Sequence, residues 1–354
     1  MQTSVLPAAV DVASPMSFPF AEPPTAGSVC EVAPGLYWLR MPLPFALNHI
    51  NLWLLRDAEG WTAVDCGIGL DDTRAHWETI FAAVVGNSGL TRVLVTHFHP
   101  DHFGNAGWLT QRFGAPLWMT ETEFLTAHAQ YETLAGFGSD ATAALFSEHG
   151  LDAQRVSGVS GRGNSYRKVV GEPPTRFVRM LDGDEIRIGG NDWRVIIGYG
   201  HAPEHAALYC KSLGVLISGD MLLPKISTNI SVWPTKPESD PLRQFLRSID
   251  RFTELPADTL VLPSHGLPFR GAHHRVQMLH DHHRDRLAEV LDACSQPRSA
   301  ADLLAVLFRR TLDTHQTFFA MGESIAHLNY LWLEGKLFRS RDGDGVYRFL
   351  NQVR

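Results

Sequence analysis

The sequence of 354 residues lacks three features, and each absence excludes a class of protein. Its four cysteines are scattered and form no CxxC pair, which argues against a disulfide framework and a thiolate zinc site. Its 31 Lys and Arg against 38 Asp and Glu give a formal net charge of −7, whereas a general nucleic-acid binder carries a basic surface. It has no run of about 18 apolar residues, so we expect no transmembrane helix and no membrane partner.

The first residues lack a positively charged stretch, and Asp11 interrupts their one apolar run. We therefore expect no secretory signal and a cytoplasmic location. Residues 1–28 are rich in Pro, Ala and Ser, which predicts a flexible lead-in. Hydrophobic residues make up 44% of the chain and charged residues 19%, so a packed core is expected.

Residues 29–268 alternate between strand and helix patterns. Period-2 or wholly apolar runs predict strands from residue 29 and at 35–43, 49–57, 60–68, 91–97, 115–120, 175–181, 185–190, 193–200, 206–212, 214–220 and 259–266. Helical spacing predicts helices at 71–86, with Asp71 or Asp72 as N-cap, and at 105–114 and 241–255. Residues 121–179 combine helical stretches with a Gly/Ser-rich patch, which indicates an insertion that forms a lid or subunit contact.

Residues 269–354 have a different pattern. Helices are predicted at 275–294, 300–310 and 322–336, followed by a hairpin at 336–350 with a DGDG turn. This order predicts a winged-helix-like module. From His273 to Arg354 there are 11 Lys and Arg against 10 Asp and Glu, a balance of +1. A nucleic-acid-binding wing is usually more basic, so packing, dimerisation or covering of a pocket is the favoured role.

Histidine is abundant, with 17 in the chain, and its densest cluster marks a candidate metal site. The segment THFHPDHFGN at 96–105 carries His97, His99, Asp101 and His102 directly after an apolar strand. In an extended stretch His97 and His99 point to the same side, and the following turn can bring Asp101 and His102 to a second point. Imidazole and carboxylate suit zinc, iron or manganese, and the lack of thiolate argues against a closed structural zinc site.

This motif resembles the HxHxDH signature of the metallo-β-lactamase superfamily, and that family's other motifs follow in order between about residues 29 and 268. The resemblance implies an α/β fold, an αββα sandwich, with two divalent metal ions, zinc first and iron or manganese as alternatives. The first ion would be held by His97, His99 and His201, the second by Asp101, His102 and His265, and Asp220 would bridge them.

The resemblance also implies roles for these residues. A metal-bridging hydroxide would attack the substrate, and Asp101 and Asp220 would be the catalytic carboxylates, Asp101 by moving a proton. Asp65, in TAVDCGI, would orient a ligand imidazole through its other ring nitrogen. His205 would have the same role, unless it is an ordinary core histidine.

The substrate predicted by this resemblance is a small ester, thioester or lactone, as in the hydroxyacylglutathione hydrolase and lactonase branches. A phosphodiesterase or endoribonuclease using the same two metals is the alternative, and iron-dependent oxygen or sulfur redox chemistry is a third reading. A small-molecule acyl substrate is expected, nucleic acid is not, and a homodimer is compatible with the tail.

Weaker signals lie in two loops and in the tail. Lys225, Asn229 and Trp233 follow Asp220 and are candidate substrate contacts, with an ordinary structured loop as the competing interpretation. Tyr166 and Lys168 would line a lid. The tail histidines, which are His273, His274, His280, His282 and His283, favour a solvated helix over a second metal site.

Overall fold

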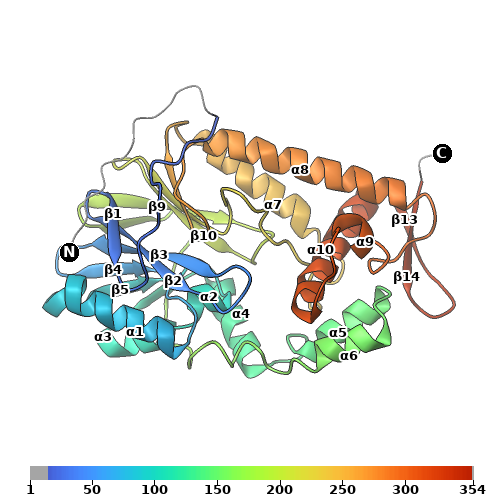
Figure 1. The fold of residues 1–354 in the computed structure, drawn as a ribbon, viewed down its shortest axis with the longest axis horizontal. Helices are drawn as coiled ribbons and strands as arrows, with labels where there is room; N and C mark the ends of the chain where they lie inside the picture. Colours follow the sequence, from blue (N-terminus) through green and yellow to red (C-terminus); the bar gives the residue numbers. More distant parts are fainter. Residues whose placement is uncertain (1–14, 353–354) are drawn as a thin grey trace.

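The computed structural model describes residues 15–352, in which two sheets lie face to face between layers of helices (Figure 1). The seven-stranded sheet has the order β1 (Val29–Ala33), β2 (Leu36–Pro42), β3 (His49–Arg56), β4 (Trp61–Val64), β5 (Leu90–Leu94), β6 (Leu117–Met119) and β7 (Val178–Arg179). The five-stranded sheet has the order β12 (Leu260–Pro263), β11 (Val215–Gly219), β10 (His205–Cys210), β9 (Asn191–Gly198) and β8 (Glu185–Ile188). Strands β4 to β7 pair in parallel, as do β11 and β12, and the other neighbours are antiparallel.

Helices cover the outer face of each sheet. α1 (Asp71–Ile80), continued by a π turn over Phe81–Val85, and α3 (Ala106–Phe113) cover the first, while α7 (Pro241–Asp250) and α8 (Ala272–Ala293) cover the second. The αββα sandwich predicted from the sequence is therefore confirmed. The predicted N-cap of α1 is wrong: Leu70 is the N-cap, and Asp71 and Asp72 occupy the first turn, where the helix dipole favours acidic side chains.

The interface between the sheets is filled by large apolar side chains, among them Trp38, Trp53 and Trp193. β10 and β11 are buried along their whole length, because one face meets the opposite sheet and the other meets helices. This explains why the sequence shows these strands as apolar runs without alternation. It also holds the carboxyl end of β11 and the amino end of β10, which lie at the same edge, in place.

The segment predicted as an insertion contains α4 (Glu121–Glu132), α5 (Ser139–Glu148) and α6 (Ala153–Ser160). Phe146 of α5 and Val159 near the end of α6 share a hydrophobic core with Ile325 in the C-terminal region and with Phe245 of α7. The insertion and the C-terminal helices thus pack together, below and beside the sandwich (Figure 1).

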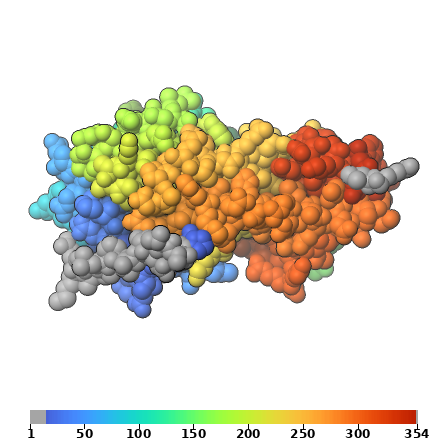
Figure 2. Space-filling model, turned by 90° about the horizontal axis from the view of Figure 1, so that it is seen from above, coloured from blue at the N-terminus to red at the C-terminus, as the bar shows by residue number. Residues whose placement is uncertain are grey.

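The C-terminal region contains α8, α9 (Leu304–Leu307), α10 (Thr314–Leu333), β13 (Leu337–Arg341) and β14 (Tyr347–Asn351), the predicted order of three helices and a hairpin. α9 is shorter than predicted, and α10 begins eight residues earlier because Asp313 and Gln316 form a capping box. Seen from above, α8 runs from the sandwich to the C-terminal helices as one continuous ridge (Figure 2).

The described part of the predicted lead-in contacts the sandwich. Ser17 pairs with Arg270, and Phe20 is buried against Trp38. The rest of that predicted segment, residues 1–14, lies outside the described residues. Within residues 15–352, no helix is both long and apolar enough to cross a bilayer.

Candidate metal centre

The seven predicted metal ligands all lie just beyond the ends of strands, at one edge of the sandwich. His97 and His99 follow β5, and Asp101 and His102 lie on α2 (Pro100–Phe103), which begins directly after them. The other three follow strands of the second sheet, namely His201 after β9, Asp220 after β11 and His265 after β12. Because the two sheets face each other, these ends meet, and the structure brings all seven side chains together in two groups.

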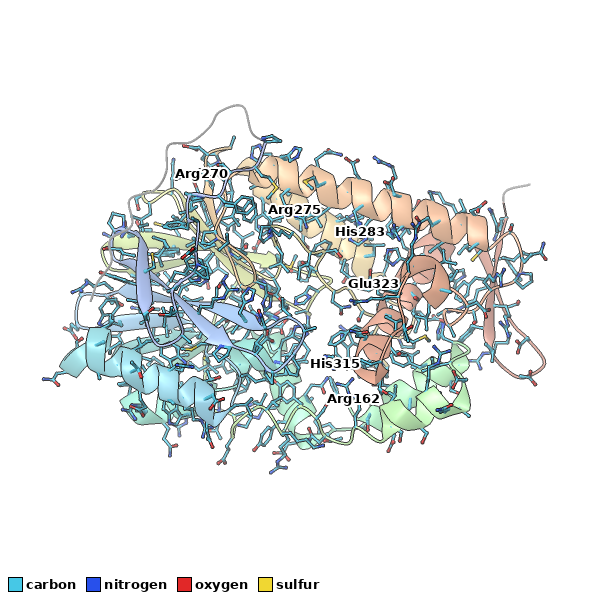
Figure 3. All side chains as sticks on the ribbon, viewed as in Figure 1. Arg162, Arg270, Arg275, His283, His315 and Glu323 are labelled. Carbon is cyan, nitrogen blue, oxygen red and sulfur yellow. The ribbon has the colours of Figure 1, made fainter. Side chains whose placement is uncertain are left out.

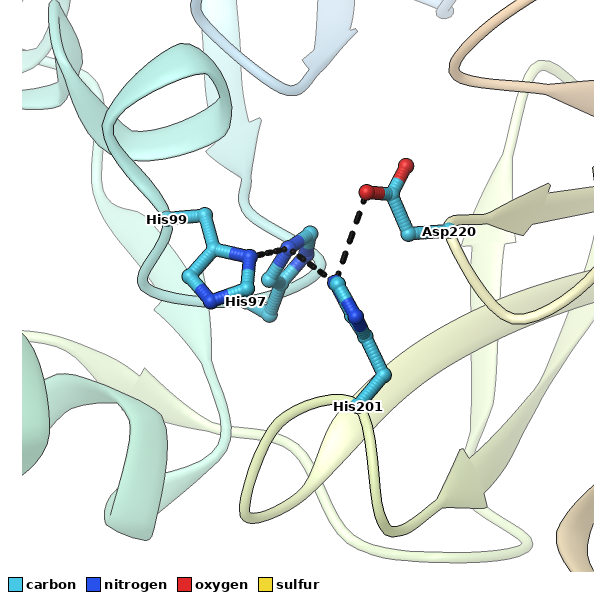
Figure 4. Close-up of side chains that lie close together, drawn as sticks. All are labelled: His97, His99, His201 and Asp220. Atoms are coloured by element: carbon cyan, nitrogen blue, oxygen red, sulfur yellow. Dashed lines mark hydrogen bonds and ion pairs between the residues drawn. The ribbon is translucent and has the colours of Figure 1, made fainter. Parts of the chain in front are cut away.

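The first group contains His97, His99, His201 and Asp220 (Figure 4). His97 Nε2 lies 2.9 Å from His99 Nδ1 and 3.2 Å from His201 Nε2, and His201 Nε2 lies 3.4 Å from Asp220 Oδ2. Two donors bound to one tetrahedral zinc ion are about 3.3 Å apart, so these separations suit a shared cation.

The second group contains Asp101, His102 and His265. Asp101 Oδ2 lies 3.8 Å from His102 Nε2 and 3.5 Å from His265 Nε2. The other carboxylate oxygen of Asp220, Oδ1, lies 3.5 Å from both His102 Nε2 and His265 Nε2. Asp220 therefore presents one oxygen to each group.

The protonation of the ring nitrogens shows that the donor set fits a cation. His201 Nδ1 donates to the Asn229 carbonyl and His265 Nδ1 donates to the His49 carbonyl, both at 2.8 Å, so in the neutral form of each ring the lone pair is on Nε2, the nitrogen that faces the group. Burial, and then the neighbouring imidazoles, hold the pKa of His97 well below its usual value, so that ring is neutral as well. Converging lone pairs in a buried site lack partners unless a positive ion lies between them.

Two buried atoms also lack a partner that a metal ion could supply. Neither His102 Nε2 nor Asp220 Oδ1 has a hydrogen-bond partner among the described residues. Burial lowers the pKa of His102, but the carboxylates of Asp65, Asp101 and Asp220 outweigh it and raise that pKa well above its usual value. Burial would raise the pKa of Asp220, yet the imidazoles of His265 and His102 hold it well below its usual range. His102 and Asp220 thus carry opposite charges, and a metal ion would take the place of the proton on His102.

Asp65 makes the contact that the sequence predicted for it. Its Oδ2 accepts a hydrogen bond from His102 Nδ1 at 2.8 Å, and its Oδ1 accepts one from the Thr96 backbone amide at 2.8 Å. The residue adopts a left-handed backbone with φ of 63°, which lets the chain turn sharply after β4. The bond leaves His102 Nε2 free to face the second group.

His205 acts on a different atom from the one predicted. Its Nε2 accepts a hydrogen bond from the backbone amide of Asp220 at 3.1 Å, so it holds the main chain of a predicted ligand and not the imidazole of one. Gly219 makes room for this contact, because a Cβ there would lie 2.2 Å from His205 Nε2. The glycine of the SGD motif thus has a packing role at this strand end.

Two side chains hold the segment between His97 and His99. The sequence does not signal Glu123 and assigns Tyr166 to a lid. The buried Glu123 carboxylate accepts hydrogen bonds from the amides of Phe98, at 3.0 Å, and Glu204, at 2.6 Å. Burial raises the pKa of Glu123 to about 8. The Tyr166 hydroxyl donates to the Phe98 carbonyl at 2.5 Å, so Tyr166, predicted as a lid residue, holds the segment between His97 and His99.

The predicted substrate contacts after Asp220 lie in different environments. The Lys225 side chain is exposed, while Asn229 acts through its backbone carbonyl, which holds His201. Trp233 packs on Phe98, with ring centroids 6.0 Å apart. Arg275 of α8, another residue the sequence did not signal, donates to the carbonyls of Leu223 and Ile226 and so fixes this loop (Figure 3).

The remaining predictions concern the lid and the tail. Lys168 is exposed, and its ammonium group donates to the Arg162 carbonyl at 3.4 Å. Within the described part of the chain, the groups of donors that could hold a metal are the two above, and neither includes a tail histidine. His283 and His327 instead form a buried pair, 3.4 Å apart, between α8 and α10.

Comparison with known proteins matches two family models to this chain. Residues 47–265 match the metallo-beta-lactamase superfamily, and residues 287–352 match the model described as metallo-beta-lactamase-like, C-terminal domain. A crystal structure of a beta-lactamase domain protein from Burkholderia ambifaria is 48% identical, covers 95% of this chain and 98% of that one, and has a TM-score of 0.89. The probable metallo-hydrolase YqjP of Bacillus subtilis is 25% identical over 315 residues, 87% of this chain and 96% of that protein.

Two further relatives have names that state an activity. The bovine acyl-coenzyme A thioesterase MBLAC2 is 25% identical over 197 residues, 53% of this chain and 63% of that protein. A hydroxyacylglutathione hydrolase of Cereibacter sphaeroides is 25% identical over 179 residues, 51% of this chain and 49% of that protein. The fold, the two groups of donors and these matches agree, and the chain belongs to the metallo-beta-lactamase superfamily of metal-dependent hydrolases.

Proposed function

We propose that this protein hydrolyses a small acyl thioester or ester, using two divalent metal ions. The observation that carries the proposal is the position of Asp220, whose two oxygens face two separate groups of imidazoles. One shared carboxylate between two donor sets is the arrangement that supports a two-metal hydrolytic site. Zinc suits the imidazole-rich set, and iron and manganese are the alternatives.

When bound, the metal ions would supply an activated water and stabilise negative charge on the substrate oxygen. His97, His99 and His201 would hold the first ion, Asp101, His102 and His265 the second, and Asp220 both. Asp101 would have a further role in moving a proton. Its side chain is 20% exposed against 10% for Asp220, so solvent and substrate can reach it.

An acyl substrate is favoured over a phosphodiester by charge and by relationship. A net charge of −7 opposes the approach of a polyanion such as RNA. The relatives named for an activity are a coenzyme A thioesterase and a hydroxyacylglutathione hydrolase, and both names describe thioester cleavage. Phosphodiester cleavage is therefore the competing outcome of the test.

The experiment is elemental analysis of the purified protein, followed on the same sample by assays with thioesters, lactones and a phosphodiester. We expect about two metal ions per chain, as two-metal sites require, and thioester turnover that a chelator abolishes. His99→Ala is the test variant, and His274→Ala, which removes an exposed histidine of α8, is the matched control. Loss of activity in both variants would show that the effect is not specific to the site.

Two results would overturn the proposal. Two metal ions with cleavage of the phosphodiester alone would assign the site to phosphorus chemistry. One iron ion per chain with oxygen consumption and no hydrolysis would assign it to redox chemistry.

A further inference from the structure

A small cavity lies where the insertion meets the C-terminal helices, next to the metal-binding loop. Its volume is about 50 Å³, room for a few water-sized groups. Tyr166, Trp233 and Phe318 form part of its lining. Tyr166 bonds to the carbonyl of Phe98, and Trp233 packs on the Phe98 ring, so the inner wall of the cavity supports the segment between His97 and His99.

Arg162 is the one charged side chain among the described residues that line this cavity. Its guanidinium lies over the ring of Phe318, with Cζ 4.5 Å from the centroid, and its Nη2 lies 3.4 Å from His315 Nδ1. Figure 3 shows Arg162 and His315 next to each other where α10 meets the insertion. The Arg162 guanidinium, which comes from the insertion, therefore contacts α10, and these two segments enclose the cavity.

The guanidinium of Arg162 lacks an anionic partner. Its Nη1 is buried without a hydrogen bond, and no carboxylate of residues 15–352 lies within ion-pairing distance. The carbonyl oxygen of the Asn164 side chain, which also lines the cavity, is already occupied, since it accepts a hydrogen bond from the Arg167 backbone amide at 2.8 Å. A guanidinium stays charged at all physiological pH values, so an unpaired, half-buried one calls for an anion.

We propose that Arg162 binds an anionic group, a carboxylate or phosphate, on the part of the thioester substrate that does not react. This inference rests on the proposed thioesterase function and names its substrate class. The cavity has room for one such group, and the rest of the leaving group would extend from it. Planar guanidinium and carboxylate or phosphate oxygens are matched in geometry, and the Phe318 ring keeps the guanidinium plane in place.

The test compares three thioesters with the same acyl group and different charge: acyl-coenzyme A, S-acyl-glutathione and the neutral acyl-N-acetylcysteamine. The readout is the ratio of kcat/KM for each anionic substrate to that for the neutral one, in the metal-loaded enzyme. We expect Arg162→Gln to lower this ratio about 10- to 100-fold, mainly through KM, because a charge-assisted hydrogen bond is lost. Arg162→Lys, which keeps the charge but not the fork, should recover part of the loss.

Arg167→Gln is the matched control. It removes an exposed arginine five residues further along the same segment, where its Nη1 lies 3.9 Å from Glu132, and it should leave the ratio unchanged. A loss with acyl-coenzyme A alone identifies phosphate as the group, and a loss with the glutathione thioester alone identifies carboxylate. An unchanged ratio in Arg162→Gln, with all three substrates slowed equally, would show that Arg162 only fastens α10 to the insertion and would overturn the inference.

Failure of the proposed function is detected separately. If the wild-type enzyme cleaves none of the three thioesters, calorimetry of free coenzyme A and free glutathione binding to the metal-loaded protein decides. Binding of either compound that weakens at least tenfold in Arg162→Gln supports the anion site without thioesterase activity. Binding that is absent, or equal in the two proteins, overturns it.

Discussion

Replacing Asp65 by Asn should selectively weaken the binding of one metal ion, the one that His102 would hold. The Asp65 carboxylate accepts the Nδ1–H of His102 at 2.8 Å in a fully buried position, and this bond leaves His102 Nε2 free for the second group of donors. An amide with its NH2 towards His102 would oppose that proton and favour the tautomer in which Nε2 carries it. Asn tolerates the left-handed backbone of residue 65, whose φ is 63°, so the turn itself should survive.

The size of the effect follows from the type of bond. A hydrogen bond to a charged group contributes about 1.5–3 kcal/mol, which corresponds to about 10- to 150-fold in the Kd of the metal that His102 would hold. Competition with a chromophoric chelator measures both metal affinities. Asp57→Asn is the control, because it removes a partly buried carboxylate at the opposite end of the same sheet. If Asp65→Asn binds both ions as tightly as the wild type, Asp65 does not set the tautomer of His102.

Three further predictions concern catalysis and stability. His99→Ala and Asp220→Ala should each reduce kcat/KM at least about 1,000-fold. Both residues lie beyond strand ends, so each variant should unfold near the temperature of the metal-free wild type, and a much lower temperature in a thermal scan would contradict this. Glu123→Gln should lower kcat about tenfold above pH 8, where the Glu123 carboxyl is ionised, with the fold intact by circular dichroism, since one amide oxygen cannot accept both backbone N–H groups that the two carboxylate oxygens hold; unchanged kinetics there would remove Glu123 from the positioning of the loop. Burial, and then His327, lowers the pKa of His283 to about 2, so the unfolded chain takes up a proton below about pH 6.5 that the folded chain refuses. Wild type should therefore lose about 2 kcal/mol more free energy of unfolding than His283→Phe between pH 7 and pH 5, and equal losses in denaturant titrations would refute this reasoning.

The parts of the site that could be predicted from sequence are those encoded locally. His97, His99, Asp101 and His102 lie within six residues, and each of the other ligands follows an apolar strand, so pattern and chemistry coincide. The supporting contacts have no such signal. Glu123 bonds to Phe98 across 25 residues of sequence, and Tyr166 bonds to the same residue across 68.

The prediction for His205 shows the limit of the same reasoning. Its spacing after His201 marks it as part of the site, but only the pairing of β10 with β11 shows that it meets a backbone amide and not an imidazole. The short α9 and the early start of α10 were missed for a related reason. Side-chain hydrogen bonds at Asp313 decide where α10 begins, whereas apolar periodicity indicates only where helices pack.

Arg275 links the chemistry of the site to the order in which the chain is made. Its guanidinium reaches back 52 residues to the Leu223 carbonyl and 49 residues to the Ile226 carbonyl, in the loop whose Asn229 carbonyl holds His201. A ribosome delivers all seven ligands before it delivers α8, so a nascent chain possesses every donor before it possesses the brace for that loop. We expect the metal affinity of the growing polypeptide to rise when α8 docks and Arg275 reaches these carbonyls.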